Sequence, residues 1–550
     1  MQVEFVLLIL SLLFFVSIIT DKIGFKFGVP ALLLFLAVGM LFGPEGVFTW
    51  FGDKDVIGYV IGIGPAQAIG TIALCVILFS GGMDTKINDV RLVAGPGVTL
   101  ATIGVLLTCI VTGILIYFIF KWSSTVETVS IWIALLMAAT MSSTDSASVF
   151  SILRTNGIKL KHNIRPLLEL ESGANDPMAY ILTTTLIGIV MTWNTELTLL
   201  GIVQDILIQL VMGGVMGFAF GKVVVELLKR SKLNNESLYP IMVLTACIFI
   251  FAATYYLQGN PYLAVYIGGL IIGNSRFTKK RQTKSFFDGL TWLSQLVMFL
   301  MLGLMVKPSE LILLEVWLPC LIISIIMIFI SRPLSVFVCL YPWSDVYTQR
   351  DKVLVSWVGL KGAVPIIFAI LCEASGVPSS GLIFNVVFLC TIVSLIVQGT
   401  SLSAIANKLK LATPQEKEKK LVYFDIDLPE EIEASAHESE VTAKMMTNGN
   451  QLKDLPVPAH TLIIMARRGE NFFVPTGSTE LQVGDKLLVI SDGNAKQVVQ
   501  EMEEEEEQIL THWWLQMTHD TKNFVHDKLD KIVETQKNLN AQRHANKNKQ

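Results

Sequence analysis

The chain carries little charge, and its charge is unevenly placed. Asp, Glu, Lys and Arg make up 16% of the 550 residues, against about a quarter in a typical soluble domain. Residues 1–410 are mostly apolar, whereas residues 411–550 are polar and rich in charge. This division excludes a single soluble globular domain. It predicts a membrane part followed by a polar C-terminal part.

Cysteine and histidine are not spaced in the sequence as a metal site or a reactive centre would require. All seven cysteines lie in the apolar part, without metal-site spacing, and are expected as small core residues. All seven histidines fall outside the apolar spans, which argues against an imidazole proton relay. A His-Glu-x-x-His motif is lacking as well. We therefore expect no enzyme, no cofactor and no nucleic-acid partner.

The apolar part divides into roughly thirteen segments long enough to span a bilayer. The expected spans are 4–20, 29–44, 60–81, 97–120, 130–153, 167–192, 202–227, 238–257, 261–274, 286–305, 311–341, 353–373 and 382–406. The first lacks a basic leader and is expected to be retained rather than cleaved. Loops after even-numbered spans hold only Lys54, Lys121 and Lys307, whereas the other loops are rich in Lys and Arg. The positive-inside rule then predicts an outer N-terminus and a cytoplasmic C-terminal domain.

The sixth span contains the most informative motif. Glu171, Ser172, Asn175 and Asp176 lie in an apolar run that continues to the length of a span. Carboxylates in a bilayer are costly, and they normally face a cavity or a partner. Ser172, Asn175 and Asp176 are spaced i, i+3 and i+4, so they share one helical face. Oxygen-bearing side chains gathered at membrane depth predict a binding site for a hard monovalent cation.

Two spans are predicted to be broken helices. The fifth holds a hydroxyl-rich run, residues 141–148, around Thr144 and Asp145, and such residues compete with helical hydrogen bonding. The twelfth holds Lys361 between two glycines, followed by Pro365. Paired broken helices in opposed repeats indicate a transporter's binding site. Asp145 and Lys361 are expected to compensate the half-helix dipoles; the alternative is a serine-rich kink and a lysine that reaches the interface.

Arg332 is a further charge with apolar sequence on both sides. One interpretation is an arginine at a helix end that extends to the interface. The other is an internal ion pair, because a buried cation needs a carboxylate partner, and Glu171 is the nearest chemical match.

Residues 1–410 resemble the NhaP-like monovalent cation:proton antiporters. The resemblance rests on Glu-Ser-x-x-Asn-Asp at 171–176, Thr144-Asp145, Arg332 and Gly-Leu-Lys-Gly-Ala-Val-Pro at 359–365. It implies a polytopic α-helical fold of about thirteen transmembrane helices with inverted repeats and two crossed broken helices. It also implies a homodimer in the cytoplasmic (inner) membrane.

The same resemblance assigns roles to individual residues. Asp176 is implied to carry the exchanged proton or monovalent cation, with oxygens lent by Thr144 and Ser172, and Asp145 is a further candidate at the cation or proton site. Glu171 and Arg332 are implied to form a structural pair, with Asn175 alongside. The family often has arginine where Lys361 stands, which keeps the charge but not the planar fork.

The polar part is predicted to hold a linker at 411–420, a small α+β module at 421–500 and a helical, partly disordered tail at 501–550. Strands are expected at 421–424, 460–467 and 486–490, with turns at 467–471 and 483–485. The pattern is similar to the TrkA-C module, the C-terminal half of potassium-conductance regulators, which implies ligand-sensing regulation. Arg467 and Arg468 are candidates for a nucleotide-like or other phosphate-bearing effector; a solvated turn is the alternative.

These observations predict an antiporter that exchanges a monovalent cation for a proton. A single titrating aspartate predicts electroneutral exchange, and the TrkA-C resemblance favours potassium over sodium. The main alternative is a regulated potassium channel or uptake subunit, but no Thr-Val-Gly-Tyr-Gly filter is found in the sequence.

Overall fold

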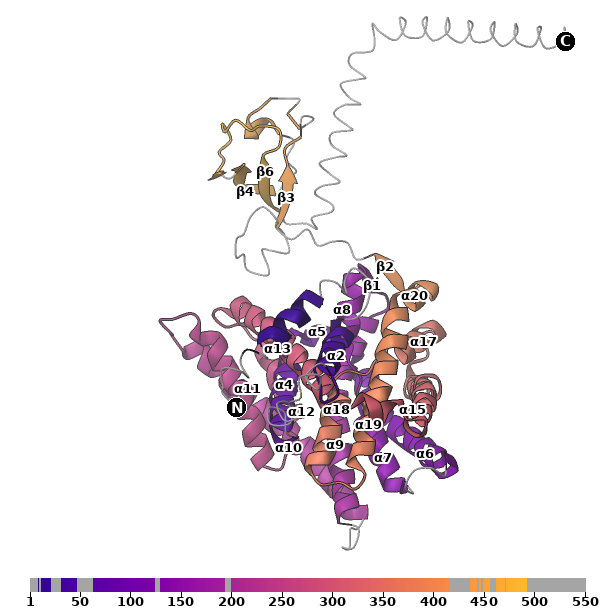
Figure 1. The fold of residues 1–550 in the computed structure, drawn as a ribbon. Helices are drawn as coiled ribbons and strands as arrows, with labels where there is room; N and C mark the ends of the chain where they lie inside the picture. Colours follow the sequence, from indigo (N-terminus) through magenta and orange to yellow (C-terminus); the bar gives the residue numbers. More distant parts are fainter. Residues whose placement is uncertain are drawn as a thin grey trace, which may run out of the picture. The chain divides into compact units, whose positions relative to one another are not determined.

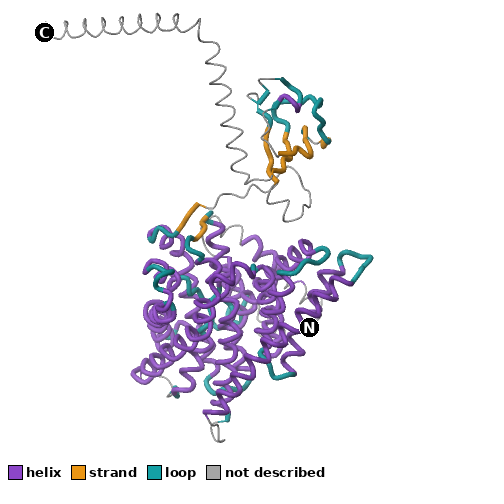
Figure 2. The backbone as a smooth tube through the Cα atoms, turned by 180° about the vertical axis from the view of Figure 1, so that it is seen from behind, coloured by secondary structure: helices purple, strands orange, loops and turns teal. Residues whose placement is uncertain are grey.

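The computed structural model describes most of the membrane part and the core of the C-terminal module. The described residues are 8, 11–20, 31–46, 63–123, 129–192, 199–414, 436–442, 445–446, 449–455, 461–469 and 471–491. The chain divides into two compact units, Met1–Gln415 and Glu416–Gln550. Figures 1 and 2 show that the first unit is built of helices and the second contains a small sheet. The expected strand at 421–424 and the expected tail at 501–550 lie outside the described residues.

The first unit is a bundle of apolar helices. Seven of its described helices are long and apolar enough to cross a membrane, and five shorter apolar helices accompany them. Its named elements are α2 (Ala31–Leu41), α4 (Ile63–Asp84), α5 (Ile87–Thr99), η2 (Leu100–Gly104), α6 (Val105–Ser123), α7 (Ile131–Thr140), α8 (Ser146–Thr155), β1 (Ile158–Leu160), α9 (Ile164–Met191), α10 (Leu199–Arg230), α11 (Leu238–Tyr256), α12 (Pro261–Gly273), α13 (Lys280–Met305), α14 (Pro308–Ile312), α15 (Leu314–Ile326), η3 (Met327–Ser331), α16 (Arg332–Cys339), η4 (Tyr341–Trp343), α17 (Gln349–Trp357), α18 (Val364–Ala374), α19 (Ser380–Ser394), η5 (Leu395–Gly399), α20 (Thr400–Lys408) and β2 (Ala412–Pro414).

Small residues bring neighbouring helices together, as is usual where lipid removes the hydrophobic driving force between them. α12 packs against α4 through Gly269 and Gly273. A Cβ atom on Gly269 would lie 2.3 Å from the carbonyl oxygen of Phe79, and one on Gly273 would lie 2.2 Å from that of Met83. Neither position therefore has room for a side chain at this helix spacing.

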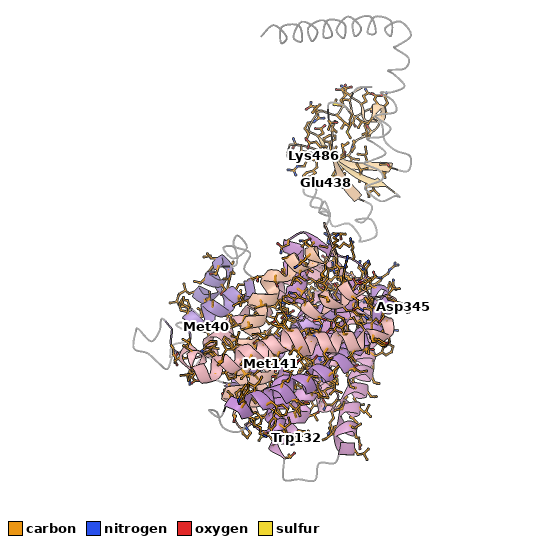
Figure 3. All side chains as sticks on the ribbon, turned by 90° about the vertical axis from the view of Figure 1, so that its right-hand side faces the viewer. Met40, Trp132, Met141, Asp345, Glu438 and Lys486 are labelled. Atoms are coloured by element: carbon orange, nitrogen blue, oxygen red, sulfur yellow. The ribbon has the colours of Figure 1, made fainter. Side chains whose placement is uncertain are left out.

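Two helices are interrupted where the sequence predicts breaks. α7 ends at Thr140 and α8 begins at Ser146, while α17 ends at Trp357 and α18 begins at Val364. At the first break, Thr140 and Ser142 donate their hydroxyls to the carbonyls of Met137 and Ala139, each over 2.7 Å. Figure 3 labels Met141, the first residue after α7. The same two carbonyls also accept the backbone amides of Met141 and Ser142, so the hydroxyls add side-chain hydrogen bonds to the last turn of α7.

A short strand pair, absent from the sequence expectations, lies at the end of the first unit. Ile158–Leu160 (β1), between α8 and α9, pairs antiparallel with Ala412–Pro414 (β2). The amide of Lys161 also donates to the Leu411 carbonyl over 3.1 Å. Residues 412–414, expected in a linker, are therefore hydrogen-bonded to the loop that precedes α9.

The second unit contains a four-stranded antiparallel sheet in the order β3-β6-β4-β5. Its strands are β3 (Ala436–Glu440), β4 (Thr461–Arg468), β5 (Asn471–Phe473) and β6 (Lys486–Ser491), and η6 (Leu452–Asp454) is a short helical turn. β4 and β6 confirm two expected strands, whereas β3 and β5 were missed. The core consists of Val441, Ala466, Leu481, Leu487 and Val489.

Candidate ion-binding site

The motif residues of α9 are buried at the crossing of the two breaks. Glu171, Ser172, Asn175 and Asp176 are 1%, 8%, 0% and 6% exposed. All lie on α9, which at 28 residues is long enough to span a bilayer despite its charges. The helical spacing that the sequence shows therefore brings their polar groups to one buried face.

Asp176 receives its hydrogen bond from the first break. The hydroxyl of Ser143, in the segment between α7 and α8, donates to the carboxylate of Asp176. Ser143 is 1% exposed. Nothing in the sequence distinguishes Ser143 as a site residue from the other members of the hydroxyl-rich run that predicts the break.

Thr144 is held by two α9 residues. Its carbonyl oxygen accepts from the Ser172 hydroxyl over 2.8 Å, and its hydroxyl accepts from the Asn175 amide over 2.6 Å. Ser172 also accepts from the Ser146 amide over 3.1 Å, at the start of α8. Asn175 was expected beside the Glu171–Arg332 pair, but the hydrogen bond of its amide group goes to the break. Its Oδ1 has no hydrogen-bond partner among the described residues.

Asp145 and Lys361 lie at the open ends of the half-helices. The Asp145 carboxylate accepts from the Ser148 amide over 3.1 Å and from the Ser148 hydroxyl, at the N-terminus of α8. The Lys361 ammonium donates over 2.8 Å to the carbonyl of Ser143, just beyond the C-terminus of α7. Each charge faces the helix end of opposite partial charge, the arrangement that stabilises a helix dipole.

The two breaks also meet through their backbones. The Asp145 amide donates to the Leu360 carbonyl over 2.8 Å. A Cβ atom on Gly362 would lie 2.5 Å from Asp145 Oδ2. The glycine therefore does more than interrupt the helix, since it leaves the space that Asp145 occupies.

Arg332 lies beside Glu171 within the helix bundle. Its Nη1 is 2.5 Å from Glu171 Oε1, and the two side chains are 6% and 1% exposed. The stem of Arg332 packs on Gly359, where a Cβ atom would lie 2.9 Å from the arginine Nε. Of the two interpretations of Arg332, the structure matches the internal pair rather than an arginine reaching the interface.

Arg467 and Arg468 both make contacts inside the second unit. Arg468 donates to both carboxylate oxygens of Asp485, over 2.9 and 2.7 Å, and to the Glu480 carbonyl over 2.9 Å. Arg467 donates to the Gly469 carbonyl over 2.7 Å, and its guanidinium lies over the Phe472 ring. An anionic effector at Arg468 would have to compete with Asp485.

Within the described part of the chain, no group of three His, Cys, Asp or Glu side chains gathers as a polydentate metal site would. The polar groups around Asp176 are instead hydroxyls, amides and carbonyls. Oxygen donors of this kind match the ligand preferences of hard cations better than those of transition metals.

Comparison with known proteins agrees with this arrangement. The family described as sodium/hydrogen exchanger, transmembrane, matches residues 7–408, and the TrkA-C domain matches residues 439–501. The K(+)/H(+) antiporter NhaP of Alkalimonas amylolytica is 37% identical over 499 residues, which cover 89% of this chain and 81% of that protein. The K(+)/H(+) antiporter NhaP2 of Shewanella sp. (strain ANA-3) is 36% identical over 484 residues, which cover 88% of this chain and 80% of that protein.

A solved structure shares the fold of the first unit. The sodium proton antiporter MjNhaP1 from Methanocaldococcus jannaschii at pH 8 superimposes with a TM-score of 0.61 at 23% identity. The match covers 73% of this chain and 100% of that one. The resemblance seen in the sequence is thereby confirmed: the chain belongs to the sodium/hydrogen exchanger family of membrane transporters and carries a C-terminal TrkA-C domain.

Proposed function

We propose that this protein exchanges potassium for protons, with Asp176 as the group that carries either one. The observation that carries the proposal is the placement of Asp176, a buried carboxylate at the meeting point of two broken helices, with a serine hydroxyl as its hydrogen-bond donor. Potassium is preferred over sodium because the K(+)/H(+) antiporters named above match both parts of this chain.

Exchange follows from competition at one carboxylate. Ionised Asp176 attracts the cation, and protonation neutralises it and releases the cation. Oxygens of Thr144 and Ser172 add to the coordination, and Asn175 Oδ1 is available as a further acceptor. A single group that carries one positive charge in either direction gives electroneutral exchange of one cation for one proton.

The other charges keep the site in place without being carried. Asp145 and Lys361 compensate the two half-helix ends at the α7–α8 break, at the start of α8 and the end of α7. Glu171 and Arg332 neutralise each other inside the bundle. In this proposal the charge of Asp176 attracts the transported ion rather than being neutralised by a fixed internal partner.

We further propose that the first unit contains thirteen transmembrane helices arranged as inverted repeats. The protein is proposed to form a homodimer in the cytoplasmic membrane. The charge distribution of the loops supports an outer N-terminus and a cytoplasmic TrkA-C domain. That domain regulates exchange by sensing a small effector of nucleotide-like chemistry, for which Arg467 and Arg468 supply positive charge.

Purified protein in proteoliposomes tests the proposal. An outward potassium gradient should drive proton uptake reported by an internal pH dye, and sodium in its place should be less effective. Asp176→Asn keeps the shape of the side chain and removes the titrating group, so exchange should be lost while the protein remains monodisperse. Asp205→Asn, at an exposed aspartate on α10, is the matched control. Normal exchange by Asp176→Asn would overturn the assignment, and potassium flux without proton movement would indicate a channel.

A further inference from the structure

The break between α17 and α18 is spanned by two side chains from a third helix. In a continuous helix the amide of Lys361 would donate to the carbonyl of Trp357, four residues earlier. Here that amide donates to the Ser394 hydroxyl over 3.0 Å. Ser394 donates to Gln398 Oε1 over 2.5 Å, and Gln398 Nε2 donates to the Trp357 carbonyl over 2.9 Å. One missing backbone hydrogen bond is thus replaced by a relay of three.

The relay is buried and its polarity is fixed. Ser394 and Gln398 are 0% and 2% exposed, so no solvent can take their place. The Trp357 carbonyl accepts only, and the Lys361 amide donates only. Gln398 supplies both functions, an amide donor on one side and a carbonyl acceptor on the other. Neither an apolar side chain nor a carboxylate of the same length can do so.

The local helix geometry supports a dedicated role. Gln398 lies in η5 (Leu395–Gly399), a π-helical turn inside the long helix formed by α19 and α20. Single π-turns inside α-helices are frequent at functional sites. Trp357 is held from the same segment a second time, because its indole nitrogen donates to the Ser401 hydroxyl over 3.0 Å.

The relay leads to the proposed site through Lys361. The backbone of Lys361 is held by Ser394, and its ammonium donates to the carbonyl of Ser143. Ser143 in turn donates its hydroxyl to Asp176. A shift of the Lys361 backbone would move the lysine away from Ser143 and disturb the donor to the transported-ion carboxylate.

We propose that Ser394 and Gln398 are positioning residues for transport, which hold the unwound segment of α17–α18 so that Lys361 stays on the Ser143 carbonyl. This inference rests on the proposed exchange at Asp176. It goes beyond that proposal by naming two residues on α19 and η5 that touch neither the ion nor the proton.

Two variants that break the relay, compared with a control variant in proteoliposomes, test the inference. Gln398→Met fills the same space without hydrogen bonds, and Ser394→Ala removes the acceptor for the Lys361 amide. Both should lower the exchange rate by about 10- to 100-fold, the effect of misplacing a group by an ångström or less. Thr391→Val is the matched control, because Thr391 is 1% exposed on the same helix and its hydroxyl donates only to its own helix, at Val387.

The pH dependence of exchange by Gln398→Glu distinguishes a positioning role from a purely structural one. The neutral carboxylic acid can still donate to the Trp357 carbonyl and accept from Ser394, whereas the carboxylate has no donor and repels that carbonyl. The exchange rate relative to the native protein should therefore fall by about 10-fold as the pH is raised from about 6 to about 9, the range in which buried carboxyl groups titrate.

The outcomes separate this inference from the proposed function. If the native protein shows no cation-proton exchange, the proposed function fails. If native exchange is present but Gln398→Met stays within about twofold of Thr391→Val, the positioning role is wrong. An unchanged pH profile for Gln398→Glu would also overturn it. If Gln398→Met does not fold, the pH profile of Gln398→Glu still tests the positioning role, because the same preparation is measured at both pH values.

Discussion

Lys361 and Ser143 form a hydrogen bond between the two broken helices, in which the lysine ammonium donates over 2.8 Å to the serine carbonyl. Ser143 also donates its hydroxyl to Asp176. Ser143 therefore binds the ammonium of Lys361 through its backbone carbonyl and the carboxylate of Asp176 through its side-chain hydroxyl. The fixed charge and the transported charge are linked without touching each other.

This contact predicts that exchange requires a positive charge at position 361 and depends less on the shape of the side chain that carries it. Lys361→Met should lower exchange at least 10-fold, because it leaves the negative end of α7 uncompensated in the membrane. Lys361→Arg should stay within about threefold, since it keeps the charge but not the geometry. Lys352→Met is the control, since Lys352 is 2% exposed on α17 and donates to Ser344 instead. Equal losses in Lys361→Met and the control would contradict the prediction.

The Glu171–Arg332 pair should matter more for stability than for transport. Glu171→Ala or Arg332→Ala alone leaves an uncompensated buried charge, which costs about 3–5 kcal/mol. Thermal unfolding in detergent should show a sharp drop for each single variant. The double variant should be clearly less damaged than the sum of the two. Strict additivity would mean that the two charges do not interact.

Exchange should be insensitive to membrane potential. One titrating carboxylate carries one unit of positive charge in each direction, so no net charge crosses per cycle. Proteoliposomes with an imposed potassium-independent potential of either sign should give the same end-point proton gradient. A gradient that follows the voltage would indicate more than one proton per cation.

Removal of the TrkA-C domain should change regulation and leave exchange in place. The candidate transport residues all lie in the unit that ends at Gln415. Truncation after Lys420 should alter apparent ion affinity or pH dependence by about 5- to 150-fold, the usual range of coupling between sites. Truncation after Lys410 also removes β2, so it should in addition lower thermal stability. Complete inactivity of a stable protein truncated after Lys420 would assign the domain to the transport machinery.

The Arg468–Asp485 pair predicts a pH dependence in the second unit. Burial acts to raise the pKa of Asp485, but the hydrogen bonds from Arg468 and the Gln482 amide, together with the arginine charge, leave that pKa below its usual value. A depressed folded-state pKa stabilises the fold above the unfolded value of about 3.9, and that stability is lost as the pH falls through the folded value. The protection factors of the β4 and β6 amides against hydrogen exchange in the full chain, which compare the observed rate with the intrinsic rate at each pH, should therefore fall below about pH 4. Asp485→Asn should show weaker protection at neutral pH and a smaller acid effect.

Local sequence spacing was enough to predict the α9 face and both breaks. Ser172, Asn175 and Asp176 share a face because helical geometry is periodic, and hydroxyl- or glycine-rich runs weaken a helix locally. The Glu171–Arg332 contact could be anticipated because few buried charges were available to pair. These are properties of single segments or of charge balance.

Contacts between distant segments could not be predicted. Ser143 differs from its hydroxyl-bearing neighbours only through its position across from Asp176. Ser394 and Gln398 belong to an apolar span, and its sequence does not predict the π-turn that contains Gln398. β1 and β2 are three-residue strands separated by about 250 residues, and neither has the length or alternation that marks a strand.

The β1–β2 pair bears on how ion binding and the C-terminal module affect each other. It fixes the point where the chain leaves the first unit, Pro414, to the loop between α8 and α9. The last described residues of the first unit are therefore hydrogen-bonded to the segment that leads into α9, the helix that carries Asp176. Because equilibrium coupling between two sites is reciprocal, a loaded ion site must bias the module by the same factor as the module biases the ion site. On the proposed regulatory role, the TrkA-C domain would therefore report the occupancy of the ion site as well as control it, and its affinity for an effector would change with the cation bound in the membrane.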